Sequence, residues 1–160
     1  MKIGVPNTLF SAYHLPYWQR LLSLLGVEAV ISEPSRLATA QSGSKLLPHE
    51  FCLPVKVFLG QIVHLLEQDV DLVLLPTLSS RNRRNFFCPK LIGLPEIVRY
   101  TLGLDERFWF APELNCNGLE LEMVHLPQQR LIVPFQFRKI ERQANDYWRT
   151  VLSRCQREKL

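Results

Sequence analysis

The 160-residue chain lacks several features that would point to common classes of protein. No apolar run approaches the roughly 20 residues that a membrane-spanning helix needs. The first apolar stretch ends in Gly4-Val5-Pro6-Asn7, which does not have the glycines of a dinucleotide-binding fingerprint. We also find no Ser/His/Asp arrangement and no paired carboxylates at a plausible site. The sequence therefore gives no sign of a membrane span, a glycine-rich phosphate loop or a hydrolase triad.

The charge of the chain is modest: 19 lysines and arginines face 15 aspartates and glutamates, a net charge of +4. We attribute much of this excess to one loop and to the C-terminal tail. The patterning predicts no basic helix, and the aromatic residues fall within apolar runs. Nucleic acid is therefore not an expected partner.

Cysteine is also scarce, with four residues and no CxxC pair. The segment 2–5 already has the pattern of a first strand, so we expect no signal peptide and a cytoplasmic protein. In a reducing compartment the thiols are expected to be free, catalytic or metal-bound and not paired in disulfides.

Two of the cysteines occur in similar settings, Glu50-Phe51-Cys52-Leu53-Pro54-Val55-Lys56 and Phe86-Phe87-Cys88-Pro89-Lys90. Each precedes a proline, a lysine and an apolar run with helical spacing. Proline suits the first turn of a helix, so each cysteine is placed at a helix N-terminus, where the partial positive charge favours a thiolate. Two interpretations stay open at this point: metal ligands or small, buried hydrophobic residues.

The periodicity predicts strands over 2–6, 27–31, 71–76 and 107–112 and helices over 15–25, 35–44, 54–68, 95–102 and 140–155. The alternation and the short connections indicate parallel pairing. We predict a three-layer α/β domain, Rossmann-like or flavodoxin-like, with a parallel sheet of at least four strands in the order 2-1-3-4. Residues 119–124 and 131–133 are weaker strand candidates.

The segment 77–90 is expected to be a long loop that leaves the carboxyl end of a parallel strand, where α/β sheets place their ligands. It contains Arg81, Arg83 and Arg84. These arginines either face water or neutralise an anion, such as a CoA phosphate or an acidic face of an electron donor. Cys116 follows the fourth predicted strand and is either a third metal ligand or an ordinary loop thiol. Cys155 fits core packing on the last helix.

Taken together, these segments resemble a known family. The resemblance rests on 2–6, on Cys52-Leu53-Pro54-Val55-Lys56 with Gly60, on 71–76, and on Cys88-Pro89-Lys90 with Gly93-Leu94-Pro95. The family is the domain associated with the activators of 2-hydroxyacyl-CoA dehydratases, which is related to the dehydratase subunits. The resemblance covers about residues 1–115 of a single domain spanning 1–160, and 116–160 adds strands and the C-terminal helix.

The resemblance implies a 4Fe-4S cluster, because the related dehydratase subunits hold one through cysteines at the carboxyl side of their sheets. It assigns Cys52 and Cys88 as ligands and does not identify a third. Because a cluster normally needs three or four thiolates, we expect Cys116 or a partner subunit to complete the set. The implied partner is an ATP-dependent activator or a dehydratase-like subunit, and a cluster shared by two copies of the chain is a further option. The Arg81 to Arg84 segment would face that partner.

In these 160 residues we expect neither the further domain of the dehydratase subunits nor the ATPase domains of the large activators. We therefore expect an electron relay or a role in cluster assembly, and leave open whether the chain is an enzyme. One alternative is an interaction or scaffold module that has lost the cluster. Another is a small-molecule enzyme with Cys52 or Cys88 as its nucleophile.

Overall fold

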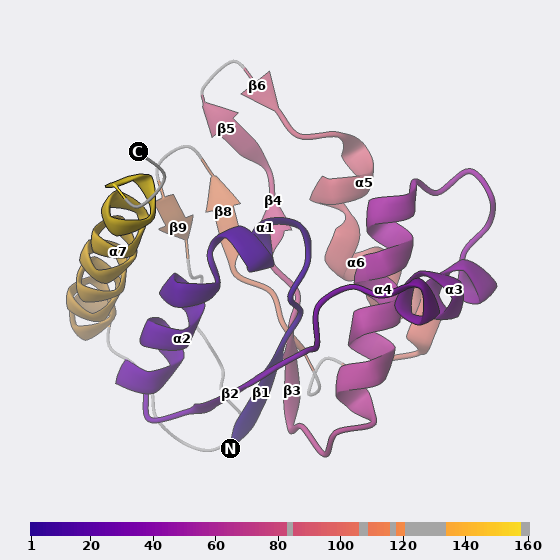
Figure 1. Cartoon of the computed structure of the whole chain (residues 1–160), viewed down its shortest axis with the longest axis horizontal. Coiled ribbons are helices and arrows are strands. Elements are labelled where there is room, and N and C mark those ends of the chain that lie inside the picture. Colours follow the sequence, from indigo (N-terminus) through magenta and orange to yellow (C-terminus); the bar gives the residue numbers. More distant parts are fainter. Residues whose placement is uncertain (83–84, 106–108, 116–117, 121–133, 158–160) are drawn as a thin grey trace.

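The computed structural model describes residues 1–82, 85–105, 109–115, 118–120 and 134–157 (Figure 1). Its main sheet has the order β2-β1-β3-β7, formed by β2 (Glu28–Ile31), β1 (Lys2–Val5), β3 (Leu72–Leu74) and β7 (Trp109–Phe110). All three pairings are parallel, with Gly4 opposite both Val30 and Val73. The prediction of an α/β domain built on a parallel sheet is confirmed, and β7 adds only two described residues to that sheet.

The helices alternate with these strands along the chain. They are α1 (Leu9–Tyr13), α2 (Leu15–Leu24), α3 (Leu37–Leu46), α4 (Leu53–Leu66), α5 (Pro89–Ile92), α6 (Leu94–Leu102) and α7 (Pro134–Arg157). The predicted helices agree with α2, α3, α4 and α6 to within about two residues, the usual uncertainty of helix ends. The last helix begins at Pro134 and not at residue 140, because proline is well suited to the first turn.

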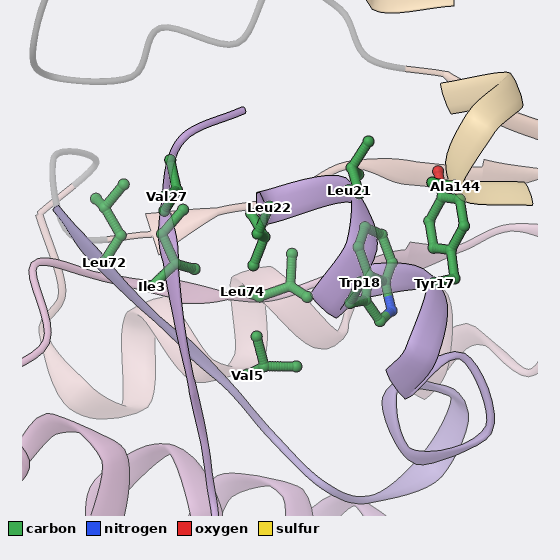
Figure 2. Packing of buried hydrophobic residues seen from close by; sticks show 10 residues of the cluster. All are labelled: Ile3, Val5, Tyr17, Trp18, Leu21, Leu22, Val27, Leu72, Leu74 and Ala144. Carbon is green, nitrogen blue, oxygen red and sulfur yellow. The ribbon is translucent and has the colours of Figure 1, made fainter. Parts of the chain in front are cut away.

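Alternate residues of the strands enter two separate hydrophobic clusters, since successive side chains of a strand point to opposite faces. Ile3, Val5, Leu72 and Leu74 pack with α2 and with Ala144 of α7. Figure 2 shows this cluster, with the side chains of α2 beside those of β1 and β3. Val73 and Leu75 belong to the second cluster, with residues of α4 and α6.

The predicted loop over 77–90 is wrong in part, because the segment contains short strands. β4 (Thr77–Leu78) pairs in parallel with β8 (Glu113–Asn115), and β5 (Ser80–Asn82) forms an antiparallel pair with β6 (Asn85–Phe86). The Thr77 amide donates to the Pro112 carbonyl (3.0 Å), so backbone pairing continues past the main sheet. β9 (Gly118–Glu120) lies antiparallel to β8. The strand predictions over 121–124 and 131–133 lie outside the described residues.

α3 and α4 cross with their backbones in direct contact at two glycines. A Cβ atom added to Gly43 would lie 1.7 Å from the Lys56 carbonyl oxygen, and one added to Gly60 would lie 2.0 Å from the Thr39 carbonyl oxygen. Only glycine fits such a close approach. This crossing fixes α4 against α3, and α4 is the helix whose first turn follows Cys52.

Candidate two-cysteine site

Cys52 is the N-cap residue of α4. Its backbone is extended (φ −68°, ψ 152°), and its carbonyl oxygen accepts the Val55 and Lys56 amides at 3.1 and 3.2 Å. The side chain makes no capping hydrogen bond and is exposed. The backbone of Cys52 thus begins the helix, and its sulfur is left available to a ligand.

Cys88 repeats this arrangement at the start of α5. Its backbone angles are φ −65° and ψ 151°, and its carbonyl oxygen accepts the Leu91 and Ile92 amides at 2.9 and 3.1 Å. Its side chain is also exposed and makes no capping hydrogen bond. The interpretation of both cysteines as buried hydrophobic residues is therefore wrong.

The two cysteine segments lie next to each other in space. The Lys90 ammonium, two residues after Cys88, donates a hydrogen bond to the Glu50 carbonyl oxygen, 40 residues away in the sequence. The same nitrogen lies 5.0 Å from the centre of the Phe51 ring. Figure 1 shows α5 beside the first turn of α4. Because Glu50 and Phe51 directly precede Cys52, these contacts bring the two motifs to one part of the surface.

The end of α4 that presents Cys52 is electropositive. Lys56 lies in the first turn and is only 9% exposed. Among the described residues its ammonium has no ion pair. Its charge adds to the partial positive charge of the helix N-terminus, and both favour a negatively charged ligand set nearby.

The other predicted site residues cannot be placed beside this pair. Arg81 belongs to β5, but its side chain is not among the described parts of the structure. Arg83, Arg84 and Cys116 lie entirely outside the described residues. Within the residues that are described, no three histidine, cysteine, aspartate or glutamate side chains gather as a metal site would require. The described part of the site thus contains two thiols, and the assignments of these four residues stay predictions.

The sequence did not point to a cleft between α3 and α4. This cleft has a volume of about 220 Å³ and is lined by Ser32, Glu33, Arg36, Ala38, Thr39, Ser42, Gly60, Gln61, Val63, His64 and Glu67. Gln61 is 1% exposed, and its amide nitrogen lies 3.1 Å from the Glu33 carbonyl oxygen and 3.3 Å from that of Asn7. A glutamine among the apolar residues of α4 was the available signal for this polar contact. The side chain ties the loops after β1 and β2 to α4.

The charge of the molecule is distributed differently from the prediction. α7 contains six basic and two acidic residues, a net +4, which equals the charge of the whole chain. Arg138, Lys139, Arg142, Arg149 and Arg154 are exposed on it. The expectation of no basic helix is wrong, because the apolar periodicity of this segment concealed the charges on its other side. Of the helices that the structure describes, none is long and apolar enough to cross a bilayer.

These features define an α/β domain that presents two cysteine thiols at neighbouring helix starts. A comparison with protein families matches residues 2–151 to the CoA enzyme activase uncharacterised domain (DUF2229). The chain belongs to this family, and the match extends beyond residue 115 into α7. Neither the curated proteins nor the solved structures contain a match.

Proposed function

We propose that the chain binds an iron–sulfur cluster through Cys52 and Cys88 and serves as an electron relay or cluster-assembly partner of an enzyme. The enzyme would be related to the 2-hydroxyacyl-CoA dehydratases and their activators. The observation that supports this proposal is that two exposed thiols stand at the starts of two helices whose leading segments are in contact through Lys90. Membership of an activase-related family is consistent with it.

The donor set fits the proposed group. Cysteine thiolates are the usual ligands of iron–sulfur clusters, and neither described thiol is used in capping. The helix N-termini and the buried Lys56 supply positive charge close to Cys52. When bound, a 4Fe-4S cluster supplies one-electron transfer. Its usual four ligands exceed what two cysteines provide, so Cys116 or a partner would complete the set.

The surface around the cysteines is suited to a protein partner. Leu53 is 62% exposed beside Cys52, and Phe86 is 71% exposed two residues before Cys88. Exposed apolar side chains around an incomplete ligand set favour contact with another protein. We propose an ATP-dependent activator or a dehydratase-like subunit as that partner. A second copy of this chain is the alternative, since it would bring two further thiols.

The hairpin before Cys88 would contribute to partner binding. β5 and β6 pair directly ahead of the cysteine, and Arg81, Arg83 and Arg84 belong to this segment in the sequence. We propose that these arginines neutralise an anionic group of the partner or of CoA.

We also interpret the arrangement as a three-layer, Rossmann-like domain. The support for this interpretation is the parallel sheet and the two hydrophobic clusters on opposite faces of β3. In such folds ligands bind beyond the carboxyl ends of the strands, which agrees with a site reached after β3.

Anaerobic purification followed by iron and acid-labile sulfide analysis tests the proposal. We expect about four iron and four sulfide per cluster, and loss of most of both in Cys52→Ser and in Cys88→Ser. Cys155→Ala, in α7 on the other side of the sheet, is the matched control and should keep the cluster. Unchanged iron in both serine variants would exclude the ligand assignment.

Absence of iron after anaerobic reconstitution would favour the alternative, a scaffold module of the same fold without a cluster. The observation favouring that alternative is that the described residues contain two thiols but no third metal-ligating side chain near them. Under this alternative the metal-free chain stays folded and monodisperse.

A further inference from the structure

The two cysteines depend on different kinds of support. Cys52 begins a 14-residue helix that contains eight buried residues. Cys88 begins a four-residue helix with none. A helix of one turn has little stability of its own. The place of the Cys88 thiol relative to the Cys52 thiol therefore depends on contacts that α5 makes with its surroundings, among them direct contacts with the segment before Cys52.

Lys90 makes such contacts from within α5. Its ammonium donates to the Glu50 carbonyl oxygen and lies over the Phe51 ring, both on the segment that enters α4. Phe51 in turn packs against the hydrophobic cluster that includes Val55, Phe58 and Leu59. The lysine therefore connects the weakly supported helix to a segment that is anchored in the core.

We infer that Lys90 is a positioning residue that holds the Cys88 thiol within bridging distance of the Cys52 thiol. The inference deepens the proposed function, because it concerns the same two cysteines. It requires no bound cluster, so it can be tested on the metal-free chain. Lys90 acts through the geometry of α5 and does not itself bind the ligand.

The chemistry of the two contacts explains the choice of lysine. A charged donor to a carbonyl oxygen is stronger than a neutral one, and a cation over an aromatic face adds a second attraction. Arginine can make both contacts. Glutamine keeps a hydrogen-bond donor without the charge, and methionine has a similar length but neither property. Replacing Lys90 by these three residues in turn separates the contribution of its charge from that of its hydrogen bond.

Phenylarsine oxide is the probe, because it bridges two neighbouring thiols: two As–S bonds form, both thiol protons leave with the arsenic-bound oxygen, and one water is released. The background carries Cys116→Ser and Cys155→Ala, which leaves only Cys52 and Cys88. We expect one arsenical per chain and protection of both thiols from alkylation. Mass spectrometry and thiol titration measure these quantities.

In this background Lys90→Met should bind the arsenical about tenfold more weakly, as expected for the loss of one charged hydrogen bond and one cation–π contact. Lys90→Arg should restore most of the affinity, and Lys90→Gln should fall between them. Lys139→Met removes a lysine from the exposed side of α7 and is the matched control. Circular dichroism checks that each variant is folded.

An affinity of Lys90→Met equal to that of the background overturns the inference. Failure of the background itself to bind the arsenical through both thiols also overturns it. The proposed function fails separately, by the absence of iron after reconstitution in a chain that still bridges the arsenical. Weaker arsenical binding in Lys90→Met, restored in Lys90→Arg, supports the positioning role whatever the iron content.

Discussion

Cys52 and Cys88 begin their helices with nearly the same backbone angles, φ −68° and ψ 152° for the first and φ −65° and ψ 151° for the second. In both cases the carbonyl oxygen accepts the first amides of the helix and the sulfur stays exposed. The helices that follow are very different in length and burial. A repeated local sequence has therefore produced the same cap twice, with unequal tertiary support.

The difference suggests a division between a fixed thiol and an adjustable one. α4 packs through its backbone against α3 and through Phe58, Leu59 and Ile62 against the sheet. α5 is held by Lys90, by the partial packing of Leu91 and by the bond of 3.1 Å from the Phe87 amide to the Ser79 carbonyl oxygen just before it. Elements with few buried contacts open at low free-energy cost, so partner binding would move α5 more readily than α4.

The largest expected effect comes from replacing one phenylalanine in each region. Phe58 in α4 is 1% exposed, so Phe58→Ala should lower the free energy of unfolding by about 4 kcal/mol, through lost burial and a cavity. Phe86, ahead of α5, is 71% exposed, and Phe86→Ala should change it by less than about 0.5 kcal/mol. Urea denaturation measures both values. Similar losses in the two variants would contradict the unequal support.

A second test uses one glycine from each region. Gly60→Ala places a Cβ atom 2.0 Å from the Thr39 carbonyl oxygen, so α3 and α4 must separate, at a cost of about 2 kcal/mol. Gly93 follows α5 with φ −86°, and its added Cβ would meet its nearest neighbour at an ordinary 3.4 Å. Gly93→Ala should therefore stay within about 0.5 kcal/mol of wild type. If Gly60→Ala unfolds at the same urea concentration as wild type, the helices do not cross as closely as described.

The sequence was sufficient to predict the parts of the fold that depend on strong periodicity. The apolar run before Pro76 and the helical spacing after Pro54 each identified one element, because burial on a known face leaves a clear pattern. The short strands after Pro76 left no such pattern. β4 pairs with β8, which lies far along the chain, so local signals could not reveal it, and the hairpin of β5 and β6 is too short to give a clear alternation.

The candidate site was predictable in its residue types but not in its geometry. The repeated Cys-Pro context identified Cys52 and Cys88, and helix capping explains their exposure. Their proximity depends on the contact of Lys90 with Glu50 and Phe51, 39 or more residues away, and no single-sequence pattern encodes a side-chain contact over that separation. The polar cleft beside Gln61 was missed for the same reason, because the hydrogen-bond partners of Gln61 come from two loops that are distant in the sequence, one after β1 and one after β2.

The prediction with the smallest expected effect compares the hydrogen bonding of buried polar side chains in α4 and in α2. The Gln61 amide nitrogen of α4 lies within hydrogen-bonding distance of three acceptors, although the Gln61 amide oxygen has no partner among the described residues. The Tyr17 hydroxyl of α2, which is the only polar group of that side chain, is buried without a hydrogen-bond partner among the same residues. Tyr17→Phe should therefore leave stability unchanged or raise it by up to about 1 kcal/mol at neutral pH. Tyr147→Phe, at an exposed side chain of α7, should stay within about 0.5 kcal/mol and serves as the control.

We also expect wild type and Tyr17→Phe to differ in how their free energies of unfolding depend on pH. Burial, and secondarily the Glu141 carboxylate, raise the pKa of Tyr17 well above its usual value. The unfolded chain ionises this tyrosine near pH 10 while the folded chain keeps it protonated, so stability is fully present below that pH and falls as the pH rises above it. Tyr17→Phe should remove this contribution to alkaline destabilisation, as measured by urea denaturation between pH 8 and pH 11. An identical decline in wild type and Tyr17→Phe would show that Tyr17 ionises as readily in the folded chain as in the unfolded one, which contradicts its burial in α2.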